Sequence, residues 1–314
     1  MEIDLSPLTI IDAHHHVWNL DENRQPWLQN EPMIPFRYGD YSAIRRNYLP
    51  DDFRRDSAAF NLVGSVYVEA EWASDDPIAE TRWIHQIAAQ HGLPNAVVAQ
   101  AWLDRPDVAE VLAGQAAFAL VRSVRHKPAS APSPDKASRG MPGSMDDPQW
   151  RAGYALLQEH GLHFDLQTPW WHLNAAADLA RDFPQTTIII NHTGLPSDRS
   201  EQGLAGWRQA LALVADQPNV CLKISGIGVP GHQWNAQLNG AIVREAIAIF
   251  GVDRAMFASN FPVDSLVATY DDIFNGFDAF TRSMSASDRR KLFHDNALQT
   301  YRLELAATTD QPSA

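Results

Sequence analysis

Histidines near the start of the chain are the side chains best suited to bind a metal ion or activate water. Residues 12–16 read Asp-Ala-His-His-His and directly follow the apolar run 8–11. Because successive side chains of a β-strand point to opposite faces, we expect Asp12, His14 and His16 on one side of a strand. Imidazoles at that spacing can hold one divalent metal ion, whose bound water becomes a nucleophile near neutral pH, or they can polarise a carbonyl directly. An exposed polar strand end is the structural alternative, and the apolar residues that follow disfavour a purification tag.

Short β-rich runs alternate with amphipathic helical patterns along nearly the whole chain, which predicts parallel strands joined by helices. The expected strands are 9–13, 62–68, 96–102, 118–124, 162–166, 186–190, 220–224 and 255–258. The expected helices include 77–91, 147–160, 173–183, 204–217 and 237–250. Two helices begin with an Asp-Pro pair at residues 76 and 147, and two end with a glycine suited to the left-handed cap, Gly92 and Gly161.

The chain has eight expected strands separated by helices, which is the number found in a closed (β/α)8 TIM barrel of the α/β class. An open doubly wound sheet is the alternative, but no glycine-rich dinucleotide turn follows the first strand. We therefore expect one barrel domain over residues 1–305 and a polar C-terminal tail at 306–314. The irregular segments 19–50 and 128–146 follow the first and fourth strands, so we expect them as long loops over the catalytic face.

Polar side chains recur at the carboxyl ends of the expected strands, where barrel enzymes place their active sites. Buried parallel strands normally carry apolar residues on both faces. Polar side chains at these positions therefore indicate either a functional site or a buried hydrogen-bond network. A hydrogen-bonded polar layer that seals the barrel is the structural alternative. The residues of this ring, beyond the two histidines of the first strand, are Tyr67, Glu69, Gln100, Trp102, Asp165, Gln167, His192, Lys223, Ser225 and Asn260.

The bulk composition excludes several classes of partner. Hydrophobic residues make up 45% and charged residues 20% of 314 residues, as in an ordinary globular protein with a sizeable core. The net charge of −13 argues against binding to nucleic acid or an anionic membrane surface. No signal peptide or membrane span is apparent, and the single Cys221 is compatible with a reducing cytoplasm, where we expect the protein. We expect a small-molecule substrate, and the oligomeric state, including a homo-oligomer, stays open.

The segment 12–18 resembles the opening of the amidohydrolase superfamily, in its amidohydrolase 2 branch of lactonases and decarboxylases. Later segments resemble the same family in the same order, over nearly the whole chain. They are Ser-Val-Arg-His at 123–126, Asn-His-Thr-Gly-Leu-Pro at 191–196, Lys-Ile-Ser-Gly at 223–226 and Ala-Ser-Asn-Phe-Pro at 258–262. The resemblance implies a distorted barrel that hydrolyses lactones in sugar-acid or aromatic catabolism, with bound metal in some members and none in others.

One position departs from the family pattern. The eighth strand of the family usually supplies an aspartate that binds metal or takes a proton from water, and this chain has Asn260. An amide is no base at neutral pH and a poorer ligand than a carboxylate. The carboxylate can come instead from Glu69 or Asp264, or the chain can be a relative that binds without turnover.

We assign roles as follows. His14, His16 and His192 are expected to surround a divalent metal ion, zinc first, or the substrate carbonyl oxygen when no metal is bound. Glu69 is the candidate base or fourth ligand, and its alternative is an ion pair with Arg125 or Lys223.

Arg125 is expected to clamp a substrate carboxylate with two parallel hydrogen bonds, and a salt bridge to Glu69 or Asp165 is its alternative. Lys223 can stabilise negative charge or form a structural pair, and His126 is expected to orient a neighbour. The other expected substrate-binding residues are Gln167, Trp102, Trp171 and Asp264.

Three functions are compatible with this pattern. The first is a hydrolase that opens a small, carboxylate-bearing cyclic ester by attack of activated water. The second is a metal-dependent decarboxylase of an aromatic or unsaturated acid. The third is a non-catalytic binder of a small molecule, for which Asn260 is the main support.

Overall fold

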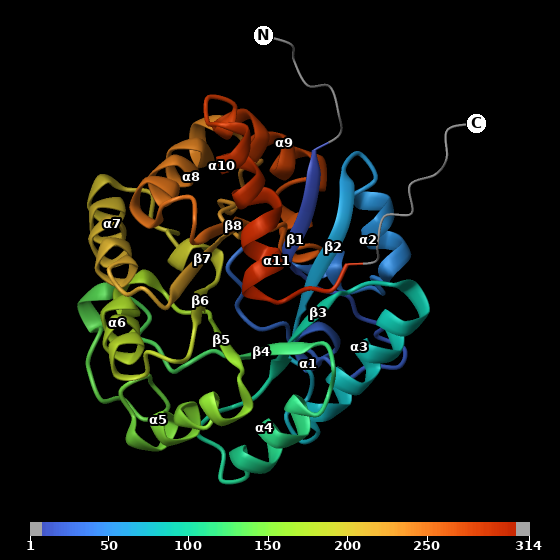
Figure 1. Cartoon of the computed structure of the whole chain (residues 1–314), viewed down its shortest axis with the longest axis vertical. Helices are drawn as coiled ribbons and strands as arrows, with labels where there is room; N and C mark the ends of the chain where they lie inside the picture. Colours follow the sequence, from blue (N-terminus) through green and yellow to red (C-terminus); the bar gives the residue numbers. More distant parts are fainter. Residues whose placement is uncertain (1–7, 306–314) are drawn as a thin grey trace.

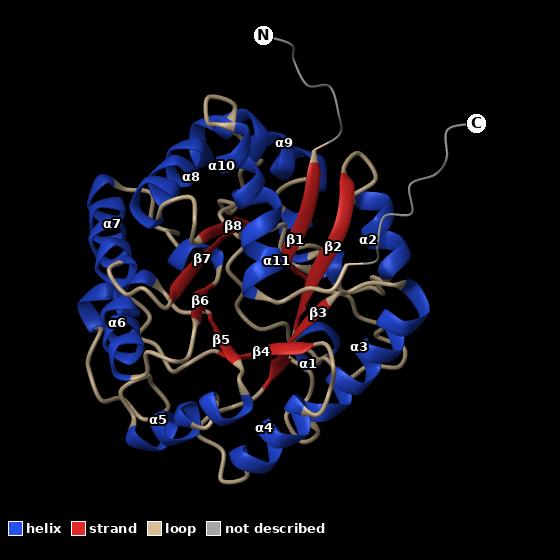
Figure 2. Ribbon diagram, in the orientation of Figure 1, coloured by secondary structure: helices blue, strands red, loops and turns tan. Residues whose placement is uncertain are grey.

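The computed structural model describes residues 8–305, which form a barrel of eight parallel strands surrounded by helices (Figure 1, Figure 2). The predicted (β/α)8 fold is confirmed, and the predicted tail at 306–314 lies outside the described residues. The strands are β1 Thr9–His15, β2 Asn61–Val68, β3 Ala96–Gln100, β4 Val121–His126, β5 His163–Leu166, β6 Ile188–Ile190, β7 Val220–Ile224 and β8 Ala255–Phe257.

The helices surround the strands, and most of them lie in the connection between one strand and the next. They are α1 Pro26–Gln29, α2 Pro50–Asp56, α3 Pro77–His91, α4 Val108–Ala116, α5 Pro148–Ala155, α6 Leu173–Asp182, α7 Glu201–Ala215, α8 Ala236–Phe250, α9 Tyr270–Thr281, α10 Ala286–Arg290 and α11 Asn296–Thr300.

The predicted helix boundaries have visible causes. The Asp76 side chain accepts a hydrogen bond from the Ala79 amide at the start of α3, and Gly92 at its end has φ 71°, as the left-handed cap requires. Asp147 caps α5 in the same way. The expected fourth strand began too early at residue 118, because Phe118 belongs to a turn in which its carbonyl accepts from the Val121 amide.

The barrel closes between its first and last strands. The strand order runs from β1 to β8, with each strand parallel to the next. The Asn260 amide donates to the His14 carbonyl at 2.8 Å, and the His16 amide donates to the Phe261 carbonyl at 2.7 Å. These bonds place the segment after β8 beside the end of β1, at the carboxyl end of the barrel.

One layer of the barrel interior is apolar and is closed by the C-terminal helix. Inward-facing side chains of the strands, such as Ile11 and Val68, pack with Ala297 of α11 and with Tyr301 and Leu303. Figure 1 shows α11 lying across the barrel opening that faces the viewer. A larger apolar cluster fills the space between the strands and the outer helices.

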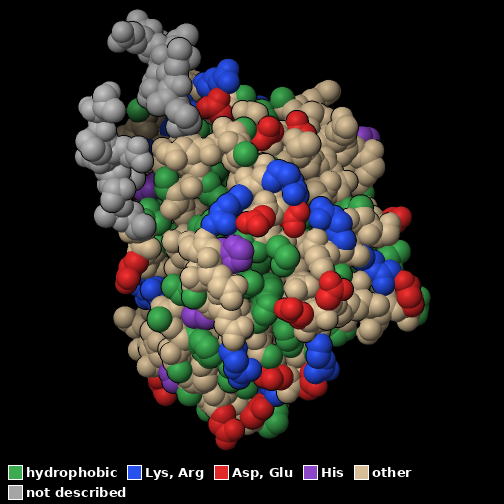
Figure 3. All heavy atoms as spheres, turned by 90° about the vertical axis from the view of Figure 1, so that its right-hand side faces the viewer, with side chains coloured by type: hydrophobic (Ala, Val, Ile, Leu, Met, Phe, Trp, Pro, Cys, Tyr) green, Lys and Arg blue, Asp and Glu red, His purple; other side chains and the backbone are tan. Residues whose placement is uncertain are grey.

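The outer surface carries acidic and basic side chains side by side on the face shown in Figure 3. Arg54 and Asp51, and Arg55 and Asp52, form such pairs within one turn of α2. Among residues 8–305, no helix has the length and apolar composition needed to cross a lipid bilayer.

Candidate active site

The end of β1 is irregular, and this irregularity decides which side chains face the site. The pairing of β1 with β2 shifts register between Asp12 and His15. Asp12 points outward, where the Tyr270 hydroxyl of α9 donates to its carboxylate at 3.2 Å. The expectation that Asp12 shares a face with His14 and His16 is therefore wrong, because the irregularity interrupts the two-residue alternation.

The same irregularity turns His15 away from its two neighbours. Its Nε2 lies 2.9 Å from the Ser65 hydroxyl, and its ring stacks on Phe53 of α2 with the centroids 4.1 Å apart. Tyr67 also points outward, where its hydroxyl donates to Glu80 of α3 at 2.8 Å, although strand alternation placed it in the polar ring.

His14 and His16 form a close imidazole pair. Their Nε2 atoms are 3.3 Å apart, and the Nδ1 of His16 lies 2.7 Å from the Val68 carbonyl. A carbonyl only accepts hydrogen bonds, so the proton of neutral His16 is on Nδ1 and its Nε2 presents a lone pair toward His14. The Nδ1 of His14 is buried and has no hydrogen-bond partner within the described chain.

His192 brings a third imidazole from the turn after β6. Its ring centroid lies 4.7 Å from that of His14, and its Nδ1 lies 3.1 Å from the Ser225 hydroxyl. Gly226 allows this approach, because a Cβ there would lie 2.6 Å from the Nδ1 of His192. Both residues have positive φ, 54° at His192 and 59° at Gly226.

Burial keeps the three imidazoles neutral. Desolvation lowers the pKa of His14, His16 and His192 well below the ordinary 6.5. The positive charge of Lys223 adds to this effect at His14, and that of Arg125 adds to it at His16 and His192. Neutral imidazoles can accept protons or bind metal ions.

The donor set fits a metal ion only in part. Two nitrogens bound to one tetrahedral zinc ion at about 2.0–2.1 Å lie roughly 3.3–3.4 Å apart, and the Nε2 atoms of His14 and His16 have this separation. However, no group of three His, Cys, Asp or Glu side chains within residues 8–305 has the geometry to hold an ion. These residues therefore supply two ligand positions and no complete centre.

Asn260 is turned toward a buried carboxylate. Its Nδ2 donates to Asp264 at 2.6 Å, and the same carboxylate oxygen accepts from Tyr38 at 3.1 Å and from the Arg37 guanidinium at 3.2 Å. Burial raises the pKa of Asp264, and the Arg37 charge opposes this rise. Asp264 therefore lies directly behind Asn260.

Arg125 forms an ion pair with Glu69. This salt bridge was the expected alternative to binding a substrate carboxylate. The Arg125 Nε donates to a Glu69 carboxylate oxygen at 2.5 Å, its Nη2 donates to the Glu69 carbonyl, and its Nη1 donates to Gln167 at 3.2 Å. The other carboxylate oxygen of Glu69 accepts from the Glu71 amide at 2.8 Å. The Nε–Nη2 edge expected to bind a substrate carboxylate is thus occupied within the chain.

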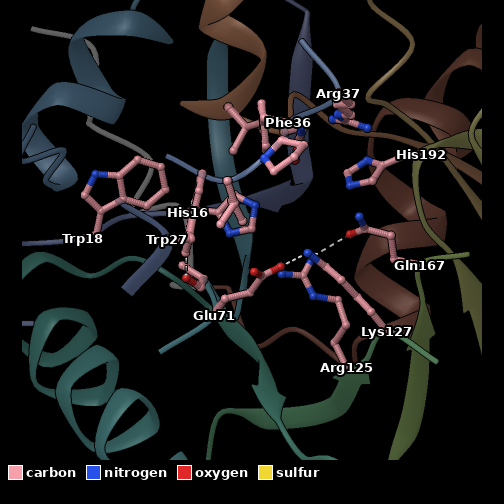
Figure 4. A pocket seen from close by; sticks show the side chains of 15 residues that line it. His16, Trp18, Trp27, Phe36, Arg37, Glu71, Arg125, Lys127, Gln167 and His192 are labelled. Carbon is pink, nitrogen blue, oxygen red and sulfur yellow. Dashed lines mark hydrogen bonds and ion pairs between the residues drawn. The ribbon is translucent and has the colours of Figure 1, made fainter. Parts of the chain in front are cut away.

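These groups surround a cavity of about 240 Å³, which we call the inner cavity. Figure 4 shows the side chain of Arg125 of β4 and side chains from the segments that follow several strands converging on it, with Glu71 and Lys127 forming an ion pair at its side. Its lining comprises His16, Trp18, Trp27, Ile34, Pro35, Phe36, Arg37, Ala70, Glu71, Arg125, Lys127, Gln167, His192, Asn260 and Val263.

Other expected site residues lie elsewhere. Lys223 is fully buried inside the barrel, where its Nζ donates to Asp165 at 2.6 Å and the Tyr301 hydroxyl donates to the same carboxylate. This arrangement is the structural pair that was its alternative role. The Trp171 indole donates to the Ala131 carbonyl at 2.9 Å, and Trp171 is absent from the lining of the inner cavity.

Trp102 and His126 line a separate, larger chamber that adjoins the inner cavity. The Nδ1 of His126 accepts hydrogen bonds from the Leu103 amide at 3.0 Å and from the Trp150 indole at 2.9 Å. These two donors fix the remaining proton of the neutral ring on Nε2, and burial lowers its pKa to about 4.

Three charged residues of the inner cavity, Arg37, Glu71 and Lys127, were missed by the sequence reasoning. Arg37 and Glu71 lie in the loops after β1 and β2, and Lys127 directly follows β4. Arg37 and Glu71 lie in loops, where the alternation of a strand gives no information about the direction of a side chain. Lys127 could have been found, because it directly follows the Arg-His pair at 125–126 at the end of a strand.

A model of the amidohydrolase family, described as Amidohydrolase, matches residues 11–303. The chain belongs to the amidohydrolase family. Within it, the chain is similar to an uncharacterised protein of Sinorhizobium fredii, with 41% identity over 95% of this chain and 100% of that protein. It is also similar to the L-fucono-1,5-lactonase of Burkholderia multivorans, with 28% identity over 93% of this chain and 96% of the lactonase.

A solved structure of an amidohydrolase from Burkholderia multivorans has the same fold. It superposes with a TM-score of 0.76 at 26% identity, covers 94% of this chain and 100% of that one, and contains bound zinc.

Proposed function

We propose that this amidohydrolase opens the ring of a small, neutral sugar lactone by attack of water on the ester carbonyl. The observation that carries the proposal is the pairing of the charges around the inner cavity. Arg37 pairs with Asp264, Arg125 with Glu69 and Lys127 with Glu71, beside a cluster of neutral imidazoles. The similarity to a sugar lactonase supports the same substrate class.

Paired charges favour a neutral, hydroxylated ligand. Each pair offers both N–H donors and oxygen acceptors, which suit the hydroxyl groups of a sugar. A substrate carboxylate would instead need a cation free of its own partner, and the best candidate, Arg125, already holds Glu69. We therefore replace the carboxylate-bearing lactone expected from the sequence with a neutral one.

The reaction needs a proton acceptor for water and a donor for the leaving oxygen. We assign both tasks to His192, which lines the inner cavity and whose Nδ1 is held by Ser225. With its proton on Nδ1, the Nε2 of His192 accepts the proton of the attacking water as the new C–O bond forms. The ring C–O bond then breaks, and the same proton passes to the leaving oxygen to give the hydroxy acid.

The low pKa of His192 suits the second half of this cycle. An imidazolium ion destabilised by burial and by neighbouring cations gives up its proton readily to an alkoxide. Arg37 and Arg125 line the same cavity and stabilise the negative charge that develops on the carbonyl oxygen. His16 lines the same cavity, and its Nε2 can accept a hydrogen bond from the attacking water, while His14, 3.3 Å away, holds the His16 ring in place.

Glu69 is not assigned as the base, because both of its carboxylate oxygens already accept hydrogen bonds. No step is assigned to a metal ion, because the described side chains form only two ligand positions. Zinc at His14 and His16 stays a prediction, supported by the bound zinc of the related Burkholderia structure.

The test is a panel of neutral aldonolactones beside lactones of the same ring size that carry a free carboxylate. Release of protons should follow hydrolysis without release of carbon dioxide. We expect kcat/KM to be at least tenfold higher for the neutral members. Carbon dioxide release from aromatic acids would favour the decarboxylase, and binding of lactones without turnover would favour the non-catalytic binder; either result would overturn the proposal.

A further inference from the structure

A second chamber of about 830 Å³ adjoins the inner cavity, and we call it the outer chamber. Trp27, Ile34 and Arg125 line both spaces, as do Glu71 and Lys127. The Glu71–Lys127 ion pair therefore stands at the boundary between the two. The two spaces therefore adjoin on the same side of the barrel wall.

The outer chamber is larger than the proposed reaction requires. A monocyclic lactone fits a cavity of the inner size, and ligand sites of several hundred Å³ hold molecules with more than one ring. The outer chamber has more than three times the volume of the inner cavity, 830 against 240 Å³. Its extra volume indicates room for a second ring attached to the reacting one.

Trp102 offers a rigid, flat surface in the outer chamber. Trp102 is 45% exposed, whereas tryptophan residues are highly buried on average. Its ring stacks on His126 with an interplanar angle of 5°, and His126 is in turn held by the Leu103 amide and the Trp150 indole. An indole that stacks on a fixed imidazole and is partly exposed to solvent is suited to stack on a planar or sugar ring.

Hydrogen-bond acceptors in the outer chamber favour a sugar over an aromatic ring. Gln100 donates to the Trp72 carbonyl at 2.8 Å, and its own Oε1 is buried without a donor within the described chain. Glu71 and Asp104 add carboxylate oxygens to the same lining. Acceptors of this kind pair with hydroxyl donors, which a glycosyl ring carries and an unsubstituted aromatic ring lacks.

We propose that the outer chamber binds a glycosyl residue of the substrate, stacked on Trp102, so that the enzyme acts on glycosylated sugar lactones. This inference rests on the proposed lactonase function and specifies its substrate class. The inner cavity takes the lactone ring, and the glycosidic bond passes the Glu71–Lys127 pair.

The experiment compares the binding of neutral sugars by calorimetry, which requires no turnover. Glucose is the monocyclic probe, and cellobiose, maltose and lactose are its glycosylated counterparts. We expect at least one disaccharide to bind tenfold or more tightly than glucose. Trp102→Ala should reduce this ratio to less than threefold while leaving the Kd for glucose unchanged, and Gln100→Leu should reduce it in the same direction.

Trp83→Ala, which removes a half-buried indole of α3 outside both spaces, is the matched control and should keep the wild-type ratio. Thermal unfolding checks that each variant is folded. Equal affinity for glucose and all three disaccharides would overturn the inference, as would a ratio that survives both Trp102→Ala and Gln100→Leu. Tight disaccharide binding without hydrolysis of any lactone would instead refute the proposed function and leave the outer chamber as a glycosyl site.

Discussion

The Nε2 atoms of His14 and His16 lie 3.3 Å apart, whereas the ring of His15 between them points away from the site. This arrangement predicts opposite effects within one tripeptide. His14→Gln or His16→Gln should lower kcat by about 10²-fold or more, because the pair positions the reacting groups, with little loss of thermal stability.

His15 provides the matched control. It is buried, contacts Ser65 and stacks on Phe53, so His15→Gln should lower the melting temperature while kcat of the folded fraction stays within about threefold of wild type. Steady-state kinetics and thermal unfolding of the three variants separate the two patterns. An equal loss of kcat at all three positions would contradict the assignment.

Metal content is the second prediction. Because no third His, Cys, Asp or Glu within residues 8–305 joins His14 and His16 in a metal-binding geometry, we expect weak zinc binding, with less than one equivalent per chain by elemental analysis after dialysis. Treatment with a chelator should then reduce kcat/KM for a lactone by less than tenfold. Stoichiometric zinc together with complete loss of activity on chelation would show that a third ligand joins the pair.

The third prediction concerns Asn260. Its amide donates to Asp264 at 2.6 Å, so Asn260→Asp places two carboxylates within hydrogen-bond distance. When two carboxylates lie so near each other, their repulsion raises the pKa of one of the two acids. We expect the variant to unfold at a lower temperature than wild type at pH 8 and to recover most of the difference at pH 5.

Combining this change with Asp264→Asn restores one donor and one acceptor and serves as the control. The double variant should regain stability at pH 8. If Asn260→Asp alone is as stable as wild type at pH 8, the two side chains are not coupled as the structure shows.

The fourth prediction follows from Glu80, which lies in α3 behind the site. Its carboxyl accepts from the Tyr67 hydroxyl and from the Ala70 amide, and burial, with the nearby charge of Glu69, raises its pKa from an ordinary 4.5 to about 8. The unfolded chain releases this proton above about pH 4.5, while the folded chain keeps it until about pH 8. Its contribution to stability is thus complete below pH 4.5 and is lost as the pH rises to about 8, by roughly 1.4 kcal/mol per pH unit at most.

Glu80→Gln imitates the protonated acid and removes this dependence. The melting temperature of the variant relative to wild type should rise steadily from pH 5 to pH 8.5. Glu110→Gln, at an exposed position of α4, should follow the wild-type curve throughout. Parallel curves for wild type and Glu80→Gln would show that Glu80 ionises normally in the folded protein.

Regular elements of this fold were predictable because their signals are local. The helix 77–91 was predicted at its observed bounds, since Asp76, Pro77 and Gly92 mark both ends within a few residues. Strand 220–224 was also predicted at its observed bounds, because a short, mostly apolar segment lies between two helical patterns. The barrel then followed from counting such elements.

The site was predictable only where strand ends define it. His14, His16, His192 and Asn260 were placed together correctly, since the carboxyl ends of parallel strands meet at one face. The orientation of Asp12 failed at an irregularity that no residue type signals. The contribution of Arg37 depends on how the long loop after β1 folds back over the barrel, which only tertiary contacts determine.

The junction between β1 and β8 also has a consequence for biosynthesis. His14 and Asn260 are hydrogen-bonded neighbours in the folded protein, but they come from the first strand and from the segment directly after the eighth. During synthesis the histidines leave the ribosome early, and Asn260 follows only after β8 has been translated. We therefore expect the proposed catalytic centre to assemble only when the whole barrel has left the ribosome.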